Sequence, residues 1–164
     1  MNDRFEEQSR VPVEVRPLVP GGALRPTVTS DELELAGESG DRQTPYGVNV
    51  ASLVILDLDD DRVVNYVEVM FRPELWTEVE TLPRLRRGRS GTIAIPGARP
   101  EIYVEEASPR VEFCRATREA LVYLEPIEPS ATTVRLSPLC AAVINGDYLG
   151  GFLVDLTTEM DWSE

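Results

Sequence analysis

The sequence predicts a mainly β domain, of α+β class with one or two short helices, arranged as an antiparallel sheet or as a barrel-like sheet. Short runs rich in Val, Ile, Leu and Tyr recur from residue 53 almost to the end of the chain. Thirteen prolines and eleven glycines separate these runs and leave little room for a long helix. Helical spacing of apolar residues is confined to one or two short segments. A fold dominated by strands follows.

Residues 1–26 predict an extended, proline-rich N-terminal arm. They hold four prolines and a pair of adjacent glycines, and proline fixes φ and lacks the N–H that helices and inner strands need. Within the arm, Val11, Val13 and Val15 alternate with polar residues and proline, which predicts a short edge strand. Residues 27–164 then form a single β-rich domain.

A β-hairpin is predicted at residues 53–58 and 63–71, two apolar runs separated by an acidic turn. A turn centred between these runs would place Leu58 opposite Val63. Both faces of this hairpin are mostly apolar, so we expect it to lie at the centre of a sheet.

A second hairpin is predicted at residues 139–144 and 148–156. Asn145-Gly146 is the preferred pair for a two-residue turn with positive φ, and it would place Val143 opposite Tyr148. Small residues lie in the middle of both strands, which permits close approach by another backbone or by a ligand.

The rest of the chain is mostly strand. Four further strands are predicted, at 92–95, 101–105, 120–124 and 132–136. One short helix is predicted over 73–82, where Pro73 suits the first helical position. The segment 109–119 fits either a second short helix or a strand.

The two predicted turns lie 85 residues apart, at Asp60 and Asn145. This offset fits either a degenerate duplication with halves at 27–90 and 91–164 or a coincidence of spacing. The two hairpins share few identical residues, so both alternatives stay open.

Composition argues against catalysis. The chain has no histidine and no lysine, so its 16 basic residues are all arginines. Imidazole-dependent triads, histidine zinc ligands, Schiff-base amines and phosphate-loop lysines are therefore excluded. We predict that the protein is not an enzyme.

A net charge of −13 points to a basic protein partner. Such a field repels nucleic acid and anionic membranes and attracts basic surfaces. The chain has no apolar run long enough to span a membrane and no apolar N-terminal leader, and its two cysteines are not spaced as a redox or metal pair. We expect a cytoplasmic protein, with self-association through the N-terminal arm as an additional option.

An acidic cluster offers an alternative function. Asp57, Asp59, Asp61 and Glu68 follow the side-chain spacing of a calcium-binding EF-hand loop, which the segment resembles over twelve residues. The resemblance implies a Ca²⁺ or Mg²⁺ site. Arg62 stands where that loop requires glycine, and the flanking residues favour strands instead of helices.

The same segment also resembles the first motif of haloacid-dehalogenase-type phosphatases, an apolar strand followed by Asp57-Leu58-Asp59. That resemblance implies Asp57 as nucleophile and Asp59 as acid/base. It covers one motif of four, and the chain lacks both the lysine and the strand–helix alternation of that fold. More loosely, the two hairpins resemble those of small bacterial β-rich families of unknown function, which implies a fold and no activity.

One strongly basic stretch follows the predicted helix. Arg84, Arg86, Arg87 and Arg89 lie within six residues, and their guanidinium groups would either bind an anionic group of a partner or offset nearby carboxylates. Taken together, the sequence predicts a non-catalytic acidic binding protein, of the immunity or inhibitor type or a component of an assembly. The alternative is a divalent-metal-binding module or metal-dependent enzyme; no other cofactor is expected.

Overall fold

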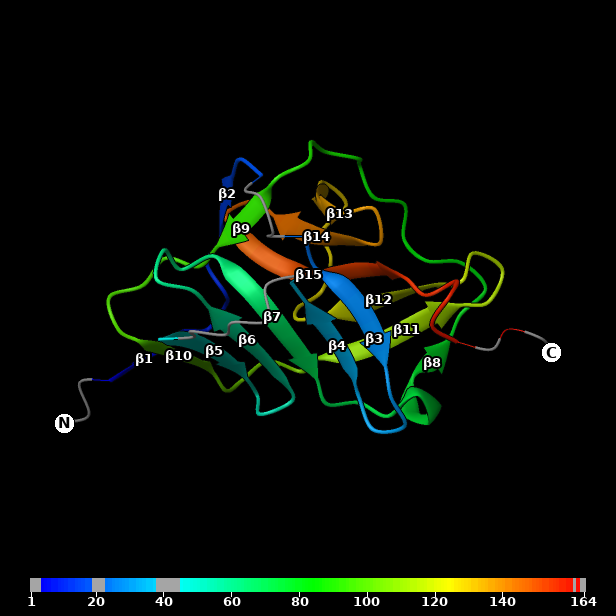
Figure 1. The fold of residues 1–164 in the computed structure, drawn as a ribbon, viewed down its shortest axis with the longest axis horizontal. Coiled ribbons are helices and arrows are strands. Elements are labelled where there is room, and N and C mark those ends of the chain that lie inside the picture. The colour runs from blue at the N-terminus through cyan, green and yellow to red at the C-terminus, as the bar shows by residue number, and fades with distance from the viewer. Residues whose placement is uncertain (1–3, 19–22, 38–44, 161, 163–164) are drawn as a thin grey trace.

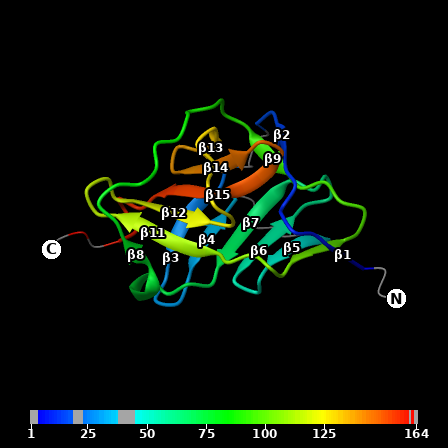
Figure 2. The ribbon, with the colours of Figure 1, turned by 180° about the vertical axis from the view of Figure 1, so that it is seen from behind.

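Two large β-sheets form the two layers of the fold, and a small two-stranded sheet lies at one end of them (Figures 1 and 2). The computed structural model describes residues 4–18, 23–37, 45–160 and 162. The seven-stranded sheet lies nearer the viewer in Figure 1, and the six-stranded sheet lies nearer in Figure 2. The prediction of a mainly β fold is confirmed.

The larger sheet is open and mostly antiparallel. Its strands are β1 (Phe5–Glu7), β3 (Arg25–Val28), β4 (Leu33–Ala36), β5 (Tyr46–Val50), β6 (Val54–Leu58), β7 (Val64–Val69) and β10 (Glu101–Val104). Their order is β1-β10-β5-β6-β7-β4-β3, and β10 pairs in parallel with both β1 and β5. The sequence predicted either an antiparallel sheet or a barrel-like sheet. This sheet is open, because β1 and β3 are its two edges and do not pair with each other. As predicted, the first hairpin is central.

The smaller sheets contain the remaining strands. The six-stranded sheet consists of β8 (Thr77–Glu78), β11 (Arg110–Cys114), β12 (Glu119–Tyr123), β13 (Thr132–Ser137), β14 (Cys140–Asn145) and β15 (Tyr148–Asp155), in the order β13-β14-β15-β12-β11-β8. The two-stranded sheet pairs β2 (Glu14–Arg16) with β9 (Thr92–Ala94). The four further strands predicted from apolar runs correspond to β9, β10, β12 and β13 and are confirmed.

The inner faces of the two large sheets share one hydrophobic core. Leu56 and Val67 of the larger sheet and Val122 and Phe152 of the smaller sheet are all fully buried members of it. Alternation explains this arrangement, since successive side chains of a strand point to opposite faces and the apolar ones turn inward. The opposite face of the seven-stranded sheet carries mostly polar side chains, with a few aromatic and apolar ones among them.

The first hairpin forms as predicted, but its predicted register was wrong. Leu58 pairs with Val64 instead of Val63, and a bulge beside Asp57 then shifts Leu56 to Val67. The cause is a longer turn. Asp59 and Arg62 close it through the Arg62 N–H donating to the Asp59 carbonyl (2.9 Å), with Arg62 at a φ of 64°.

The second hairpin also forms with a shifted register. Asn145 pairs with Tyr148, so the two turn residues are Gly146 and Asp147 instead of Asn145 and Gly146. Gly146 has a φ of 64°, which the first position of such a turn requires and which glycine adopts without strain. The prediction of close approach by another backbone is confirmed at Gly151, where an added Cβ would meet the Val122 carbonyl oxygen.

The predicted helix over 73–82 was wrong. A single 3₁₀ turn, η1 (Pro73–Leu75), is the one helical element in the described part of the chain. Trp76 ends it in an extended conformation, buries its ring to 6% exposure and donates its Nε1–H to the Phe71 carbonyl (3.2 Å). The next residues then pair with β11, so tertiary contacts outweigh the weak helical pattern. The segment 109–119 fitted either a second short helix or a strand, and the structure has a strand there, β11.

The N-terminal arm lies against the domain. Its described residues contribute β1, β2 and the start of β3, and the predicted edge strand is in part β2. Val11 and Val13 are buried in the core, and backbone hydrogen bonds link them to Leu149 and Asp147.

A duplication with halves at 27–90 and 91–164 would divide the chain at residue 90. The two large sheets do not divide there, because β8, which precedes residue 90, belongs to the six-stranded sheet and β10, which follows it, belongs to the seven-stranded sheet.

Candidate functional site

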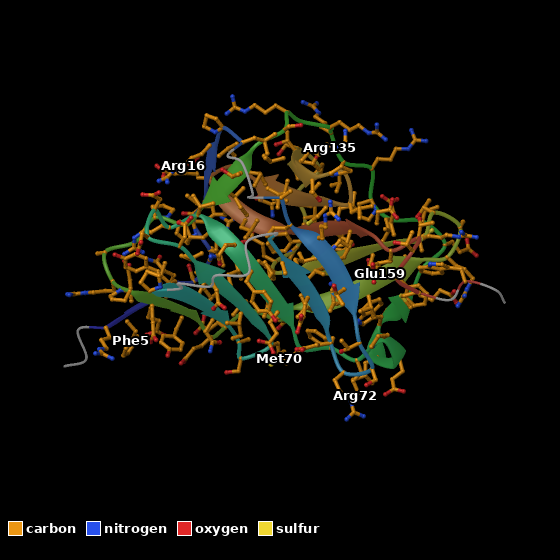
Figure 3. The ribbon with its side chains drawn as sticks, in the orientation of Figure 1. Phe5, Arg16, Met70, Arg72, Arg135 and Glu159 are labelled. Atoms are coloured by element: carbon orange, nitrogen blue, oxygen red, sulfur yellow. The ribbon has the colours of Figure 1, made fainter. Side chains whose placement is uncertain are left out.

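The outer face of the seven-stranded sheet carries two rows of side chains that run across all seven strands. In strand order from β1 to β3, the first row is Phe5, Glu101, Gly47, Asp57, Tyr66, Ala36 and Arg25. The second row is Glu7, Tyr103, Asn49, Ile55, Glu68, Glu34 and Thr27. We call these two rows, together with Glu32 beside them, the acidic face. Figure 3 labels Phe5 at the β1 edge of this face.

Negative charge dominates the acidic face. Five of the fourteen residues in the two rows are acidic, and Arg25 is the one base among them. Glu34 and Glu68 stand directly opposite each other on β4 and β7. Like charges in directly opposed positions destabilise a sheet. The fold therefore keeps an arrangement that is unfavourable for its own stability.

The carboxyl groups crowd most closely around Glu32, in the turn before β4. Hydrogen bonding with Glu68, partial burial, and the neighbouring Glu34 together raise the pKa of Glu32 to about 7, from an ordinary value of 4.5. Because Glu32 interacts with the carboxyl groups of both Glu34 and Glu68, the three groups cannot all ionise without repulsion. Near neutral pH, Glu32 is therefore poised between its neutral and charged forms.

Replacing Glu68 with glutamine is expected to stabilise the protein at high pH. Because the folded pKa of Glu32 lies above its ordinary value, this group favours folding fully below pH 4.5, and that contribution is lost as the pH rises through about 7. Removing the opposed charge should raise the free energy of unfolding by about 0.5–1 kcal/mol at about pH 8 and by less at about pH 5. Urea unfolding at both pH values measures the difference, with Glu80→Gln as the matched exposed control. An equal effect of Glu68→Gln at both pH values would contradict the shifted pKa.

Aromatic and apolar groups interrupt the acidic face and shape a shallow hollow. Gly47 has no side chain, and around it lies a cavity of about 210 Å³, whose lining includes Asp57 and Glu101 on either side. Tyr103 lines it too and donates its hydroxyl to Glu101 Oε2 (3.2 Å). The charge of Glu101 and this hydrogen bond raise the pKa of Tyr103. A hollow with a carboxylate on each side suits a cationic side chain.

The predicted metal ligands are divided between this face and the turn at its end. Asp57 and Glu68 belong to the acidic face, with Glu68 opposite Ile55 on β6. Asp59 caps its own turn, because its Oδ1 accepts the N–H groups of Asp61 (2.9 Å) and Val63 (3.0 Å). Among the residues that the structure describes, no three acidic or cysteine side chains are grouped so that they could hold a metal ion. The structure thus does not gather the four predicted ligands into one site.

The arginine-rich stretch lies along the edge strand β13. The Thr133 N–H donates to the Arg86 carbonyl (2.9 Å) and the Arg135 N–H donates to the Arg89 carbonyl (3.0 Å). The stretch is therefore held by its backbone at the edge of the six-stranded sheet, and its guanidinium groups are exposed. It does not adjoin the acidic face.

A polar network that the sequence did not indicate joins the arm to the second hairpin. Asn145 is 2% exposed and donates to Glu125 Oε2 (2.9 Å) and to the Pro126 carbonyl (2.9 Å), while its Oδ1 accepts the Glu128 N–H (3.0 Å). Arg10 donates from Nε to Glu125 Oε1 (2.9 Å) and stacks on Tyr148 at 3.8 Å from the ring centroid. Asn145 resembled a turn residue in the sequence, so no local signal revealed its bridging position.

The two cysteines offer no evident nucleophile. Burial raises the pKa of Cys140 to about 12. Hydrogen bonds with Thr117 lower the pKa of Cys114, but its side chain is 1% exposed and its Sγ–H donates to the Glu80 carbonyl (3.2 Å). Both thiols are free and buried.

Comparison with known proteins adds no relative. No protein-family model matches the chain, and no curated protein matches it significantly in sequence. The part of the chain that the structure describes holds no helix of the length and hydropathy of a membrane span.

Proposed function

We propose that the protein is a non-catalytic acidic binding protein that docks a basic protein partner through its acidic face. It would act either as an inhibitor of the immunity-protein type or as a component of a larger assembly. The absence of histidine and lysine from the chain supports binding over turnover, because few groups remain for proton transfer near neutral pH.

The observation that carries this proposal is the gathering of Glu32, Glu34 and Glu68 on one face. Hydrogen bonding with Glu68, partial burial, and the neighbouring carboxyl group of Glu34 raise the pKa of Glu32 to about 7, and the opposed charges of Glu34 and Glu68 disfavour the isolated protein. A cationic partner would reverse the sign of that interaction, since each carboxylate would then face a positive group. Binding would lower the pKa of Glu32 and release a proton.

The hollow at Gly47 supports a specific anchor within this interface. Asp57 and Glu101 stand on either side of it, and Tyr103 and Ile55 line it with apolar surface. A guanidinium or ammonium group on an aliphatic stem matches both features, since the stem packs against apolar groups while the charge meets carboxylates. The acidic face therefore suits a partner that has basic residues at the centre of its binding surface.

Affinity capture from host lysate with three immobilised baits tests the proposal. The baits are the wild type, a face variant with Glu34→Gln, Glu68→Gln and Glu101→Gln, and a control variant with Glu80→Gln, Glu106→Gln and Asp147→Asn. Both variants change the net charge equally, and the control positions are exposed and lie off the acidic face. We expect a basic protein to be retained at about 50 mM salt and released at about 500 mM.

Affinity for the purified partner then separates the acidic face from net charge. Calorimetry should give roughly tenfold or greater loss of affinity for the face variant and little loss for the control variant. Equal affinities of the two variants would place the interface elsewhere. Recovery of only acidic partners, or of none at low salt, would overturn the proposal.

We further propose that the protein acts in the cytoplasm. Cys114 and Cys140 are both free, which suits a reducing compartment. Self-association through the N-terminal arm is a further proposal, supported by the place of β1 at the edge of its sheet, where a backbone edge can pair with another strand. Sedimentation of the full chain over a range of concentrations tests it, and a monomer at every concentration would reject it.

A further inference from the structure

A second surface, on the opposite sheet, has the contrary charge. A groove of about 520 Å³ lies between the arginine-rich stretch and the strands β13, β14 and β15. Three arginines line it, Arg84 and Arg87 from the stretch and Arg135 from β13. Figure 3 labels Arg135 below the loop that crosses the top of the molecule, and nitrogen-tipped side chains extend from that loop.

These arginines lack the carboxylate partners that the rest of the chain would lead one to expect. The chain has 29 acidic residues against 16 arginines. Even so, none of the guanidinium groups of Arg84, Arg87 and Arg135 forms an ion pair or a hydrogen bond with another residue in the described part of the chain. By contrast, Arg10 and Arg115 each bind a glutamate. The groove arginines therefore make no direct ion pair with a carboxylate of the described residues.

The backbone around the groove is positioned by contacts that leave little freedom. The Gly88 N–H donates to Thr133 Oγ1 (3.3 Å), and an added Cβ at Gly88 would lie 2.0 Å from the Thr133 carbonyl oxygen. Such close approach fixes the stretch against β13. Arg84 and Arg87 line the groove from this stretch, and Arg135 lines it from the neighbouring strand. Their guanidinium groups are exposed and unpaired, so their N–H donors are available to the oxygen atoms of a multivalent anion.

The rest of the groove indicates a small ligand with more than an anionic group. Leu85, Leu139, Ala141 and Leu153 supply apolar lining. The carboxylates of Glu119 and Asp155, which pair across β12 and β15, lie in the same groove. Apolar surface would contact an organic body, and the carboxylates would accept hydrogen bonds from its hydroxyl or amino groups. A long polyanion is disfavoured by these two carboxylates and by the net charge of −13.

We propose that this groove binds a small organic molecule bearing a multivalent oxyanion, with Arg84, Arg87 and Arg135 holding the anionic group. Phosphate esters and polycarboxylates share the chemistry that these arginines recognise. The proposal is independent of the acidic face and of any protein partner.

Calorimetric titration with inorganic pyrophosphate and with citrate, at constant ionic strength, tests the site and distinguishes the two sources of anion. The groove variant carries Arg84→Gln, Arg87→Gln and Arg135→Gln, and the control variant carries Arg72→Gln, Arg99→Gln and Arg118→Gln, at exposed positions outside the groove. We expect at least one anion to bind the wild type, with affinity reduced roughly tenfold or more in the groove variant and by less than about twofold in the control. Binding of pyrophosphate alone indicates a phosphate ester, and binding of citrate alone indicates a polycarboxylate.

Three results would overturn the proposal. One is failure of both anions to bind the wild type at about 10 mM, with circular dichroism showing a folded protein. The second is equal loss of binding in the groove and control variants, which would indicate net charge alone. The third is tighter binding of a single-stranded oligonucleotide than of either small anion, lost in the groove variant, which would assign the arginines to nucleic acid instead.

Discussion

Replacing Gly151 with alanine is expected to lower the free energy of unfolding by about 3 kcal/mol or more, because it forces a side chain against the backbone of a neighbouring strand. An added Cβ would lie 1.9 Å from the Val122 carbonyl oxygen and 3.0 Å from the Val122 carbonyl carbon. Neither atom can move away by a change of rotamer. β12 and β15 must therefore separate near the centre of the six-stranded sheet, where Gly151 pairs with Tyr123.

Urea unfolding followed by tryptophan fluorescence measures this loss, and thermal unfolding should show a decrease in Tm of about 6–12 °C. Gly47→Ala is the matched control. It also places a methyl group on a strand, but the added Cβ would lie 3.5 Å from the nearest atom, the Leu56 carbonyl oxygen, which is ordinary contact. We expect that control to change the free energy of unfolding by less than about 0.5 kcal/mol. Equal stabilities of the two variants would show that the close approach at Gly151 relaxes easily.

Replacing Asn145 with alanine should cost about 3 kcal/mol, because three polar groups lose their partner in a buried setting. Glu125 Oε2, the Pro126 carbonyl and the Glu128 N–H all bind the Asn145 side chain. Asn49→Ala is the matched control, because the Asn49 side chain accepts a single hydrogen bond, from the Ser52 N–H (2.8 Å), on the outer face of the other sheet. That control should cost about 1 kcal/mol or less.

The pH dependence of the same network gives a second measurement. Burial would raise the pKa of Glu125, but hydrogen bonds from Arg10 and Asn145 and the charge of Arg10 hold it below the ordinary value of 4.5. A lowered folded pKa contributes stability above pH 4.5 that is lost as the pH falls through the folded pKa. Asn145→Ala removes part of that contribution, so the difference in stability between wild type and variant should shrink in acid. A difference that stays constant from neutral pH into acid would reject the role of Asn145 in holding Glu125 ionised.

The two charged surfaces differ in how far the sequence could predict them. The arginine-rich stretch is contiguous, so four of its arginines were visible as a group. Arg135 was not, because it joins them only through the pairing of the stretch with β13. Asp57 and Glu68 were identified as candidates from the spacing of a calcium-binding loop, which says nothing about a sheet face. They share a face because they lie on paired strands.

The sequence indicated only some of the remaining acidic residues of the acidic face. Glu101 lies on β10, a strand that the sequence did predict. Successive side chains of a strand point to opposite faces, so the buried Ile102 indicates that Glu101 points outward. Glu34 lies on β4, a strand of four residues that was not predicted. Their convergence depends on the insertion of β10 between β1 and β5 and of β4 beside β7. No local pattern specifies those neighbours.

The sequence by itself determined the β class, the positions of both hairpins and the poverty of catalytic groups, since apolar runs, turn residues and composition act locally along the chain. Only the tertiary structure decided the registers, the open seven-stranded sheet and the places where charges gather. A bulge beside Asp57 and another in β15 each shift the strand pairing by one residue. At Trp76 the weak helical pattern does not produce a helix, because burial of the side chain stabilises an extended conformation instead. The physical reason is that pairing between distant strands and packing against the shared core exceed the small local preferences of each segment.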